Sequence, residues 1–122
     1  MKAAVVGLGS MGLNHFKILQ SIKDVQAYGV DPISRLAEFK DIDELFNNVK
    51  IDFAVIATPT TTHSDIALKF VEKSIPILIE KPVFKSSKEA NLIKNRLAKN
   101  DCKVVVGHIE RFNPVCQTLA ME

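Results

Sequence analysis

Three glycines near the amino terminus have the spacing of a turn that binds phosphate groups. They lie in Gly7-Leu8-Gly9-Ser10-Met11-Gly12, which follows the apolar run 3–6 and opens a segment with helical periodicity. Gly7 permits a tight turn, Gly9 lets a ligand approach the backbone, and Gly12 allows the helix to pack closely on the strand. Unpaired N–H groups and the helix dipole at such a position favour a pyrophosphate. The residues predicted to bind it are Gly7, Gly9, Ser10, Met11 and Gly12.

An acidic residue stands where a dinucleotide-binding unit needs one. Asp31 closes the second apolar run and lies 19 positions after Gly12. A carboxylate there accepts hydrogen bonds from the adenosine ribose and repels a 2′-phosphate, which favours NAD as the cofactor. Arg35 is near enough in sequence to meet a 2′-phosphate, so NADP stays open as an alternative. Asp31-Pro32 is also a common turn opening, but strand, turn, helix and acid together favour dinucleotide binding.

Apolar runs alternate with helical patterns along the chain, and these elements must position the residues above. Continuous apolar runs predict buried parallel strands at residues 3–6, 25–30, 53–57, 75–79 and 103–106. Two helices are predicted at residues 11–22 and 41–49. A third is predicted after a threonine cluster, where Thr62 is expected to cap the helix, and a fourth after the capping box at residues 86–89. This order predicts an α/β fold, a Rossmann doubly wound parallel sheet with three α/β/α layers.

Composition bounds the class of protein. The chain has 122 residues, of which 47% are hydrophobic and 25% are charged, and a net charge of +2. This length suits one domain, and so small a charge predicts no nucleic-acid or membrane partner. Cys102 and Cys116 have no metal-ligand spacing, so we expect free thiols, no metal and a cytoplasmic location.

A further tripeptide, Glu80-Lys81-Pro82, directly follows the fourth predicted strand. Together with Gly-x-Gly-x-x-Gly-x-x-His15, Thr58-Pro59-x-x-x-His63 and the segment Gly-His-Ile-Glu-Arg-Phe-Asn-Pro at residues 107–114, it resembles the Gfo/Idh/MocA oxidoreductases. The resemblance covers essentially the whole chain, and the tripeptide is much more specific than the glycines. Residues 108–114 look most like the members that oxidise the 3-hydroxyl of UDP-N-acetylglucosamine.

The resemblance implies hydride transfer between the nicotinamide and a hydroxyl-bearing carbon of a sugar, nucleotide-sugar or cyclitol substrate. By this likeness Lys81 is the catalytic residue, donating to the reacting hydroxyl and stabilising its developing negative charge. Glu80 is expected to orient and charge-balance Lys81. Pro82 is expected to fix the turn, where an X-Pro bond tolerates the cis form.

The likeness also places Lys81 beside the nicotinamide ribose. Further cofactor contacts are thus implied at six residues: Thr58, Pro59, His63, Glu80, Lys81 and Arg111. For His63 the alternative is hydrogen bonding at the helix start, and for Arg111 a solvated side chain. We expect His15 to be a packed helix residue.

The same resemblance divides the chain into a dinucleotide-binding domain, residues 1–107, and a segment, residues 108–122, that leads toward a substrate domain. In the family that second domain supplies an Asp/Glu-x-x-x-His general base and usually the subunit contacts of a homo-oligomer. We therefore expect negligible turnover from these residues alone. The short link between Asp31 and Asp52 predicts an open adenine pocket.

Two rival functions use a glycine turn after the first strand. A stand-alone NAD-sensing regulatory domain would change assembly without catalysis, and an S-adenosylmethionine-dependent methyltransferase usually has a differently spaced turn. A lysine at the position of hydride transfer favours the oxidoreductase, because a sensor has no use for it.

Overall fold

Five parallel strands form one sheet in the described part of the chain, residues 1–108 and 113–120 of the computed structural model. The strands are β1 (Lys2–Val6), β2 (Gln26–Val30), β3 (Phe53–Ile56), β4 (Ile77–Ile79) and β5 (Val104–Val106). They lie in the order β2-β1-β3-β4-β5, and each neighbouring pair is parallel. The helices are α1 (Ser10–Ser21), α2 (Ile42–Asn48), α3 (His63–Glu72), α4 (Ser87–Leu97) and α5 (Pro114–Ala120), and the 3₁₀ turn η1 (Thr60–Thr62) precedes α3.

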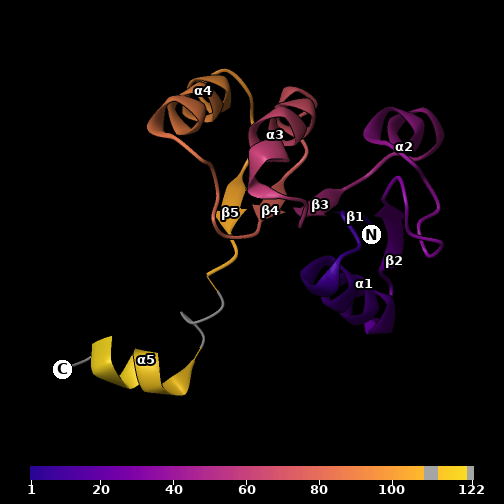
Figure 1. Ribbon diagram of the computed structural model, residues 1–122, viewed down its shortest axis with the longest axis horizontal. Helices are drawn as coiled ribbons and strands as arrows, with labels where there is room; N and C mark the ends of the chain where they lie inside the picture. Colours follow the sequence, from indigo (N-terminus) through magenta and orange to yellow (C-terminus); the bar gives the residue numbers. More distant parts are fainter. Residues whose placement is uncertain (109–112, 121–122) are drawn as a thin grey trace.

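The helices cover the sheet from both sides, which confirms the doubly wound, three-layer fold. Figure 1 shows α1 on one face of the sheet and α2, α3 and α4 on the other. The chain moves from β1 to β2 in one direction and then returns past β1 to β3. Because each crossover is right-handed, this reversal puts α1 opposite the later helices. It also makes the carboxyl ends of β1 and β3 the place where a ligand fits.

A short extension of the sheet lies beyond β2. Phe39 forms an isolated parallel bridge with Val30, its N–H donates to the Gly29 carbonyl at 3.2 Å, and its carbonyl accepts from the Asp31 N–H at 3.0 Å. If this bridge is counted as a strand, the order across the sheet becomes 3-2-1-4-5-6, the order of dinucleotide-binding folds. Because the link after Asp31 is short, the position of a further edge strand is filled by this one bridged residue.

Hydrophobic residues alternate between the two faces of β1. Ala4 and Val6 belong to the larger core under α2, α3 and α4. Val5 belongs to a smaller core with Phe16 of α1. Both faces are therefore apolar, which is why buried strands of this kind read as continuous apolar runs.

The capping box before α4 forms, with a shift of one residue. The Ser86 hydroxyl accepts the Glu89 N–H at 3.3 Å, as expected. The Glu89 carboxylate accepts the Lys85 N–H at 3.1 Å, one residue before the partner of a standard capping box. Two N–H groups at the start of α4 are thus paired.

The last described helix, α5, stands apart from the sheet and its covering helices (Figure 1). All of its residues are exposed, including Val115 and Leu119. Within the described residues, no helix is long and apolar enough to cross a membrane.

Both cysteines are free thiols, as expected. Cys116 is exposed on α5, whereas Cys102 donates to the Ile75 carbonyl at 3.1 Å. Burial raises the pKa of Cys102, so this thiol stays protonated at neutral pH.

Candidate functional site

The glycine turn joins β1 to α1, and its three glycines meet three different demands. Gly7 has φ +89°, and a Cβ on it would lie 2.9 Å from the Ala57 carbonyl carbon. A Cβ on Gly12 would lie 1.7 Å from the Gly7 carbonyl oxygen. A Cβ on Gly9 would meet no protein atom within 4 Å. Gly7 and Gly12 are therefore needed for the fold itself, whereas the space beside Gly9 is free for a ligand.

The start of α1 offers unpaired N–H donors. Gly9 is the N-cap residue and makes no side-chain capping bond, and the first turn contains no acidic residue. The helical hydrogen bonds begin with the Leu13 N–H, which donates to the Gly9 carbonyl at 2.8 Å. The preceding N–H groups, from Ser10 to Gly12, have no helical partner, so this helix end is suited to an anion. Ser10 and Met11 are exposed there.

Asp31 lies at the carboxyl end of β2 and is held by three backbone donors. One carboxylate oxygen accepts the Leu8 N–H at 2.9 Å, and the other accepts the N–H groups of Ile33 and Ser34 at 2.8 and 2.9 Å. Partial burial opposes ionisation, but these donors and the charge of Lys40 outweigh it and hold the pKa of Asp31 below its ordinary value. The carboxylate is therefore ionised at neutral pH and fixed beside the glycine turn.

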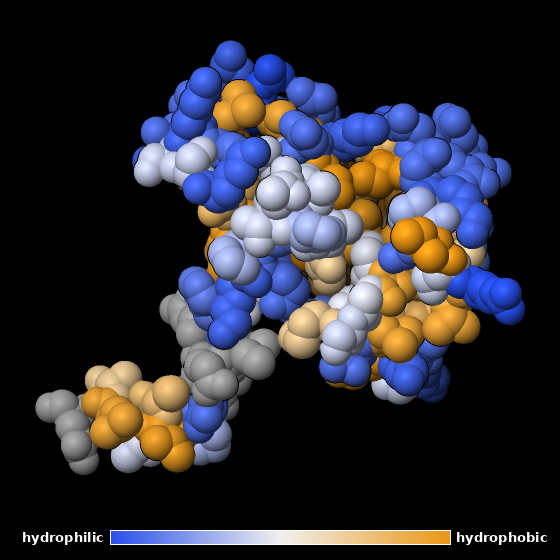
Figure 2. Space-filling view, in the orientation of Figure 1, coloured by the Kyte–Doolittle hydropathy of each residue, from blue (hydrophilic) through white to orange (hydrophobic). Residues whose placement is uncertain are grey.

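A cavity of about 760 Å³ opens over the carboxyl ends of β1, β2 and β3. This volume lies in the usual range for small-molecule and cofactor sites, roughly 300–1,000 Å³. Figure 2 shows apolar surface between α2 and α3, whose Ile42 and Ile66 line the cavity. The predicted residues that it brings together are Gly7, Gly9, Asp31, Thr58 and Pro59.

The basic residue beside Asp31 is not the one that the sequence suggested. Arg35 is exposed and does not line the cavity. Lys40 does line it, and its charge acts on Asp31. Lys69, from α3, also lines the cavity and pairs with Asp43 at 3.1 Å. Neither position follows from a local pattern: Lys40 reaches the cavity because Phe39 pairs with the edge of β2, and Lys69 reaches it because α3 packs over the sheet beside α2.

The loop after β3 is fixed by its own hydroxyl groups. Thr62 Oγ1 lies 2.7 Å from Thr58 Oγ1 and 2.7 Å from the Pro59 carbonyl oxygen. The prediction that Thr62 caps the next helix is wrong, because α3 has no side-chain capping bond at Thr62. The hydroxyl instead stabilises the turn that places Thr58 and Pro59 in the cavity wall.

His63 lies behind this wall and not in the cavity. Its side chain is 1% exposed, and its two ring nitrogens lie 2.7 Å from the Thr58 carbonyl oxygen and 2.8 Å from the Val83 carbonyl oxygen. A carbonyl oxygen only accepts, so both contacts are hydrogen bonds together only when the ring carries both protons. The expected direct contact of His63 with a cofactor gives way to a link between two loops.

Glu80 follows β4 and pairs with a helix residue. Its carboxylate is buried at 7% exposure and lies 2.5 Å from Nε2 of His15 on α1. The expected partner, Lys81, is exposed and forms no ion pair within the described residues. The Lys81–Pro82 peptide bond is cis, as the sequence allowed. His15, expected to be a packed helix residue, thus has a buried carboxylate as its partner. Its place on α1, three residues after Gly12, is the sequence feature that points to such a role.

Neither Glu80 nor Lys81 lines the cavity; both stand at the next strand end from it. Arg111, the last of the predicted cofactor contacts, lies outside the described residues. Among the described residues, no group of three histidine, cysteine or acidic side chains could hold a metal ion.

Comparison with known proteins agrees with this geometry. A family profile described as an oxidoreductase family with an NAD-binding Rossmann fold matches residues 1–108. The NAD⁺-dependent scyllo-inositol 2-dehydrogenase of Bacillus subtilis is 30% identical over 93% of this chain and 37% of its own length. The UDP-N-acetylglucosamine 3-dehydrogenase of Acidithiobacillus ferrooxidans is 27% identical over 98% of this chain and 40% of its own length.

Solved structures give the same result. The UDP-N-acetylglucosamine 3-dehydrogenase from Acidithiobacillus ferrooxidans superposes with a TM-score of 0.87 at 26% identity, over 99% of this chain and 41% of that chain. GenD2 from gentamicin A biosynthesis, solved in complex with NAD, superposes with a TM-score of 0.79 at 27% identity, over 88% of this chain and 34% of that chain. The chain therefore spans about two fifths or less of these relatives. The comparisons give no support to a stand-alone NAD-sensing domain.

Proposed function

Because the chain belongs to the Gfo/Idh/MocA oxidoreductase family, with its NAD-binding Rossmann fold, we propose that it holds NAD for hydride transfer. The dinucleotide would lie across the carboxyl ends of β1, β2 and β3, with its pyrophosphate at the start of α1 and its adenosine ribose at Asp31. Lys81 would stand at the nicotinamide end. NADP is a weaker fit, because an ionised Asp31 repels a 2′-phosphate.

The observation that supports this most directly is the open space beside Gly9. A side chain there would meet no protein atom, although both neighbouring turn glycines are closely packed. Gly9 is the N-cap residue of α1 and directly precedes the N–H groups that have no helical partner. Gly9 and Asp31 line the same cavity, so the start of α1, suited to a pyrophosphate, and an acceptor for a ribose hydroxyl belong to one site.

Lys81 supplies charge to the reaction we propose. The bound nicotinamide supplies the hydride acceptor or donor at its ring. The ammonium of Lys81 donates a hydrogen bond to the substrate hydroxyl and stabilises the negative charge that develops on its oxygen as the proton leaves. Because this side chain is exposed and has no ion-pair partner among the described residues, it is free to meet a substrate.

The substrate class we propose is a sugar, nucleotide sugar or cyclitol with an oxidisable secondary hydroxyl. Its support is the likeness to inositol and UDP-N-acetylglucosamine dehydrogenases. The proton acceptor would come from a separate substrate domain, through which a homo-oligomer would also form. Residues 1–107 would be the dinucleotide-binding domain and residues 108–122 the lead into the substrate domain. These 122 residues alone would turn over negligibly.

The test joins the chain to the substrate domain of the scyllo-inositol dehydrogenase and follows NADH formation with inositols and UDP-N-acetylglucosamine. We expect turnover in the fusion, a loss of about a thousandfold or more in Lys81→Ala, and none detectable for the chain alone. Lys17→Ala, an exposed position on α1, is the matched control and should keep the full rate. A Lys81→Ala fusion as fast as the unaltered fusion would remove Lys81 from the mechanism.

A further inference from the structure

We propose that His15 and His63 are positioning residues that grip the segment carrying Lys81 from opposite faces of the sheet. This inference rests on the proposed function of Lys81. Glu80 and Val83 flank the Lys81-Pro82 pair directly, and each contacts one of the two histidines. We call this arrangement, His15–Glu80 and Val83–His63, the histidine clamp.

The first half of the clamp comes from α1. Nε2 of His15 lies 2.5 Å from Oε1 of the buried Glu80 carboxylate, 65 residues away in sequence. Gly107, after β5, leaves room for that carboxylate, because a Cβ on Gly107 would lie 3.0 Å from Oε1. Glu80 is therefore enclosed between a helix and a neighbouring strand end. With this contact made, its carboxylate is directed to His15 and not to Lys81.

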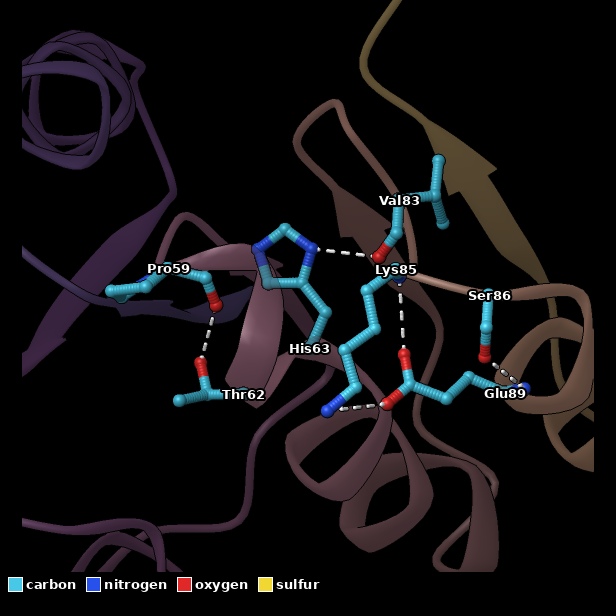
Figure 3. A network of polar contacts seen from close by, with 7 residues as sticks. All are labelled: Pro59, Thr62, His63, Val83, Lys85, Ser86 and Glu89. Carbon is cyan, nitrogen blue, oxygen red and sulfur yellow. Dashed lines mark hydrogen bonds and ion pairs between the residues drawn. The ribbon is translucent and has the colours of Figure 1, made fainter.

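The second half comes from the start of α3. Figure 3 shows the ring of His63 pointing to the Val83 carbonyl, with which Nδ1 makes a 2.8 Å contact. Nε2 of the same ring lies 2.7 Å from the carbonyl oxygen of Thr58, in the cavity wall. One buried ring thus contacts both the loop that contains Thr58 and the segment that contains Lys81.

The clamp sets the position of the backbone that carries an exposed lysine. Lys81 itself forms no ion pair within the described residues, so the contacts of its neighbours Glu80 and Val83 fix where it stands in the fold. That backbone is fixed just before and just after the Lys-Pro pair. The two histidines that fix it belong to α1 and α3. The start of α1 would hold the pyrophosphate, and His63 at the start of α3 contacts Thr58. Cofactor position and lysine position are thereby set by the same two helices.

Amide hydrogen exchange of residues 79–85, measured without cofactor, tests the clamp directly. His15→Leu should speed exchange of this segment about tenfold, while His15→Gln, which keeps a donor for Glu80, should restore protection. Lys17→Leu, on the same helix, is the matched control and should change nothing. Equal exchange in His15→Leu and Lys17→Leu would overturn the role of His15.

Two near-isosteric variants separate the two contacts of His63. The Asn amide reaches the place of Nδ1 and the Gln amide reaches the place of Nε2. His63→Gln should therefore loosen residues 79–85, and His63→Asn should loosen the loop around Thr58 instead. The same response in both segments from both variants would mean that His63 only fills the core. If either variant fails to fold, the His15 series still decides on the clamp.

Binding of NADH and ADP-ribose, which lacks the nicotinamide, distinguishes positioning from general damage. Lys81→Ala should raise the Kd for NADH about tenfold and leave ADP-ribose unchanged. His15→Leu should reproduce this pattern, with ADP-ribose affinity within about twofold of the unaltered chain. An equal loss of both ligands in His15→Leu would contradict positioning. If the unaltered chain binds neither ligand, the proposed function is wrong. The hydrogen-exchange experiments then still test the clamp, because they are made without cofactor.

Discussion

The carboxylate of Asp31 holds two turns together, and in the proposed function it also binds the adenosine ribose. Three backbone N–H groups bind it from the glycine turn and from the turn that follows β2. The two carboxylate oxygens offer two lone pairs each, so one lone pair, on the oxygen that binds Leu8, remains to accept from a ribose hydroxyl. The residue that we propose for the ribose therefore also orders the glycine turn that we propose for the pyrophosphate.

Removing this carboxylate should change the choice of cofactor. In Asp31→Ala we expect NAD binding to weaken about tenfold, because charge-assisted hydrogen bonds to the ribose are lost. NADP binding should hold or improve, since repulsion of the 2′-phosphate is relieved. Isothermal titration calorimetry with both cofactors measures the ratio, and an unchanged ratio would exclude Asp31 from the ribose.

The base that then meets the 2′-phosphate should be Lys40 and not Arg35. Lys40 lines the cavity and Arg35 does not. In the Asp31→Ala background, Lys40→Ala should lower NADP affinity about fivefold, the effect of one charge-assisted contact. Arg35→Ala is the matched control and should leave it unchanged. The opposite result would restore the assignment made from sequence.

The same carboxylate predicts a pH dependence of stability. The pKa of Asp31 is lower in the folded chain than its ordinary value, so ionisation favours folding. This contribution is present above the unfolded pKa of about 3.9 and is lost as the pH falls through the folded pKa. Urea unfolding should show Asp31→Asn less stable by about 1 kcal/mol from pH 7 to pH 5, with the gap closing below about pH 4. A gap that does not shrink as the pH falls from 5 to 2.5 would contradict this assignment.

The glycine turn and α1 form a single element in which fold and binding can be separated. Gly9→Val should keep the melting temperature within about 3 °C, because its Cβ meets no protein atom. It should abolish NADH binding by filling the path of the pyrophosphate. Gly12→Val should instead unfold the chain, since its Cβ would overlap the Gly7 carbonyl. Circular dichroism melts and NADH fluorescence titration measure the two effects, and full NADH binding by Gly9→Val would refute the turn assignment.

Across the whole molecule, the sheet and its covering helices should be independent of α5. Every residue of α5 is exposed and the helix lies apart from the sheet. A chain ending at residue 108 should therefore melt within about 3 °C of the longer one and bind NADH equally well. Calorimetric melts and fluorescence titration compare the two. A large loss of stability would mean that α5 packs on the sheet in solution.

The order of elements was predictable because it depends on local patterns. Buried parallel strands need continuous apolar runs and helices need an apolar stripe, so β1 to β5, α1 and α2 are predictable with ends shifted by one or two residues. The starts of α3 and α4 are predictable from the threonine cluster and the capping box. The turn glycines and Asp31 were predictable for the same reason, since strand, turn and acid follow one another within a single unit. Pro82 likewise predicts a turn in which the preceding peptide bond can be cis, and the Lys81–Pro82 bond is cis.

Other features depended on contacts between distant segments, which no local pattern contains. His15 and Glu80 are 65 residues apart and meet only because α1 packs beside the end of β4. Thr62 has good capping chemistry, yet the loop carbonyl of Pro59 and the Thr58 hydroxyl compete for it. Lys40 enters the cavity because Phe39 pairs with the edge of β2. The sequence by itself determined which chain units form and which chemistry they bring, because both follow from short-range periodicity and residue type. Only the tertiary structure decided which side chains become partners, because that depends on how the helices pack across the sheet.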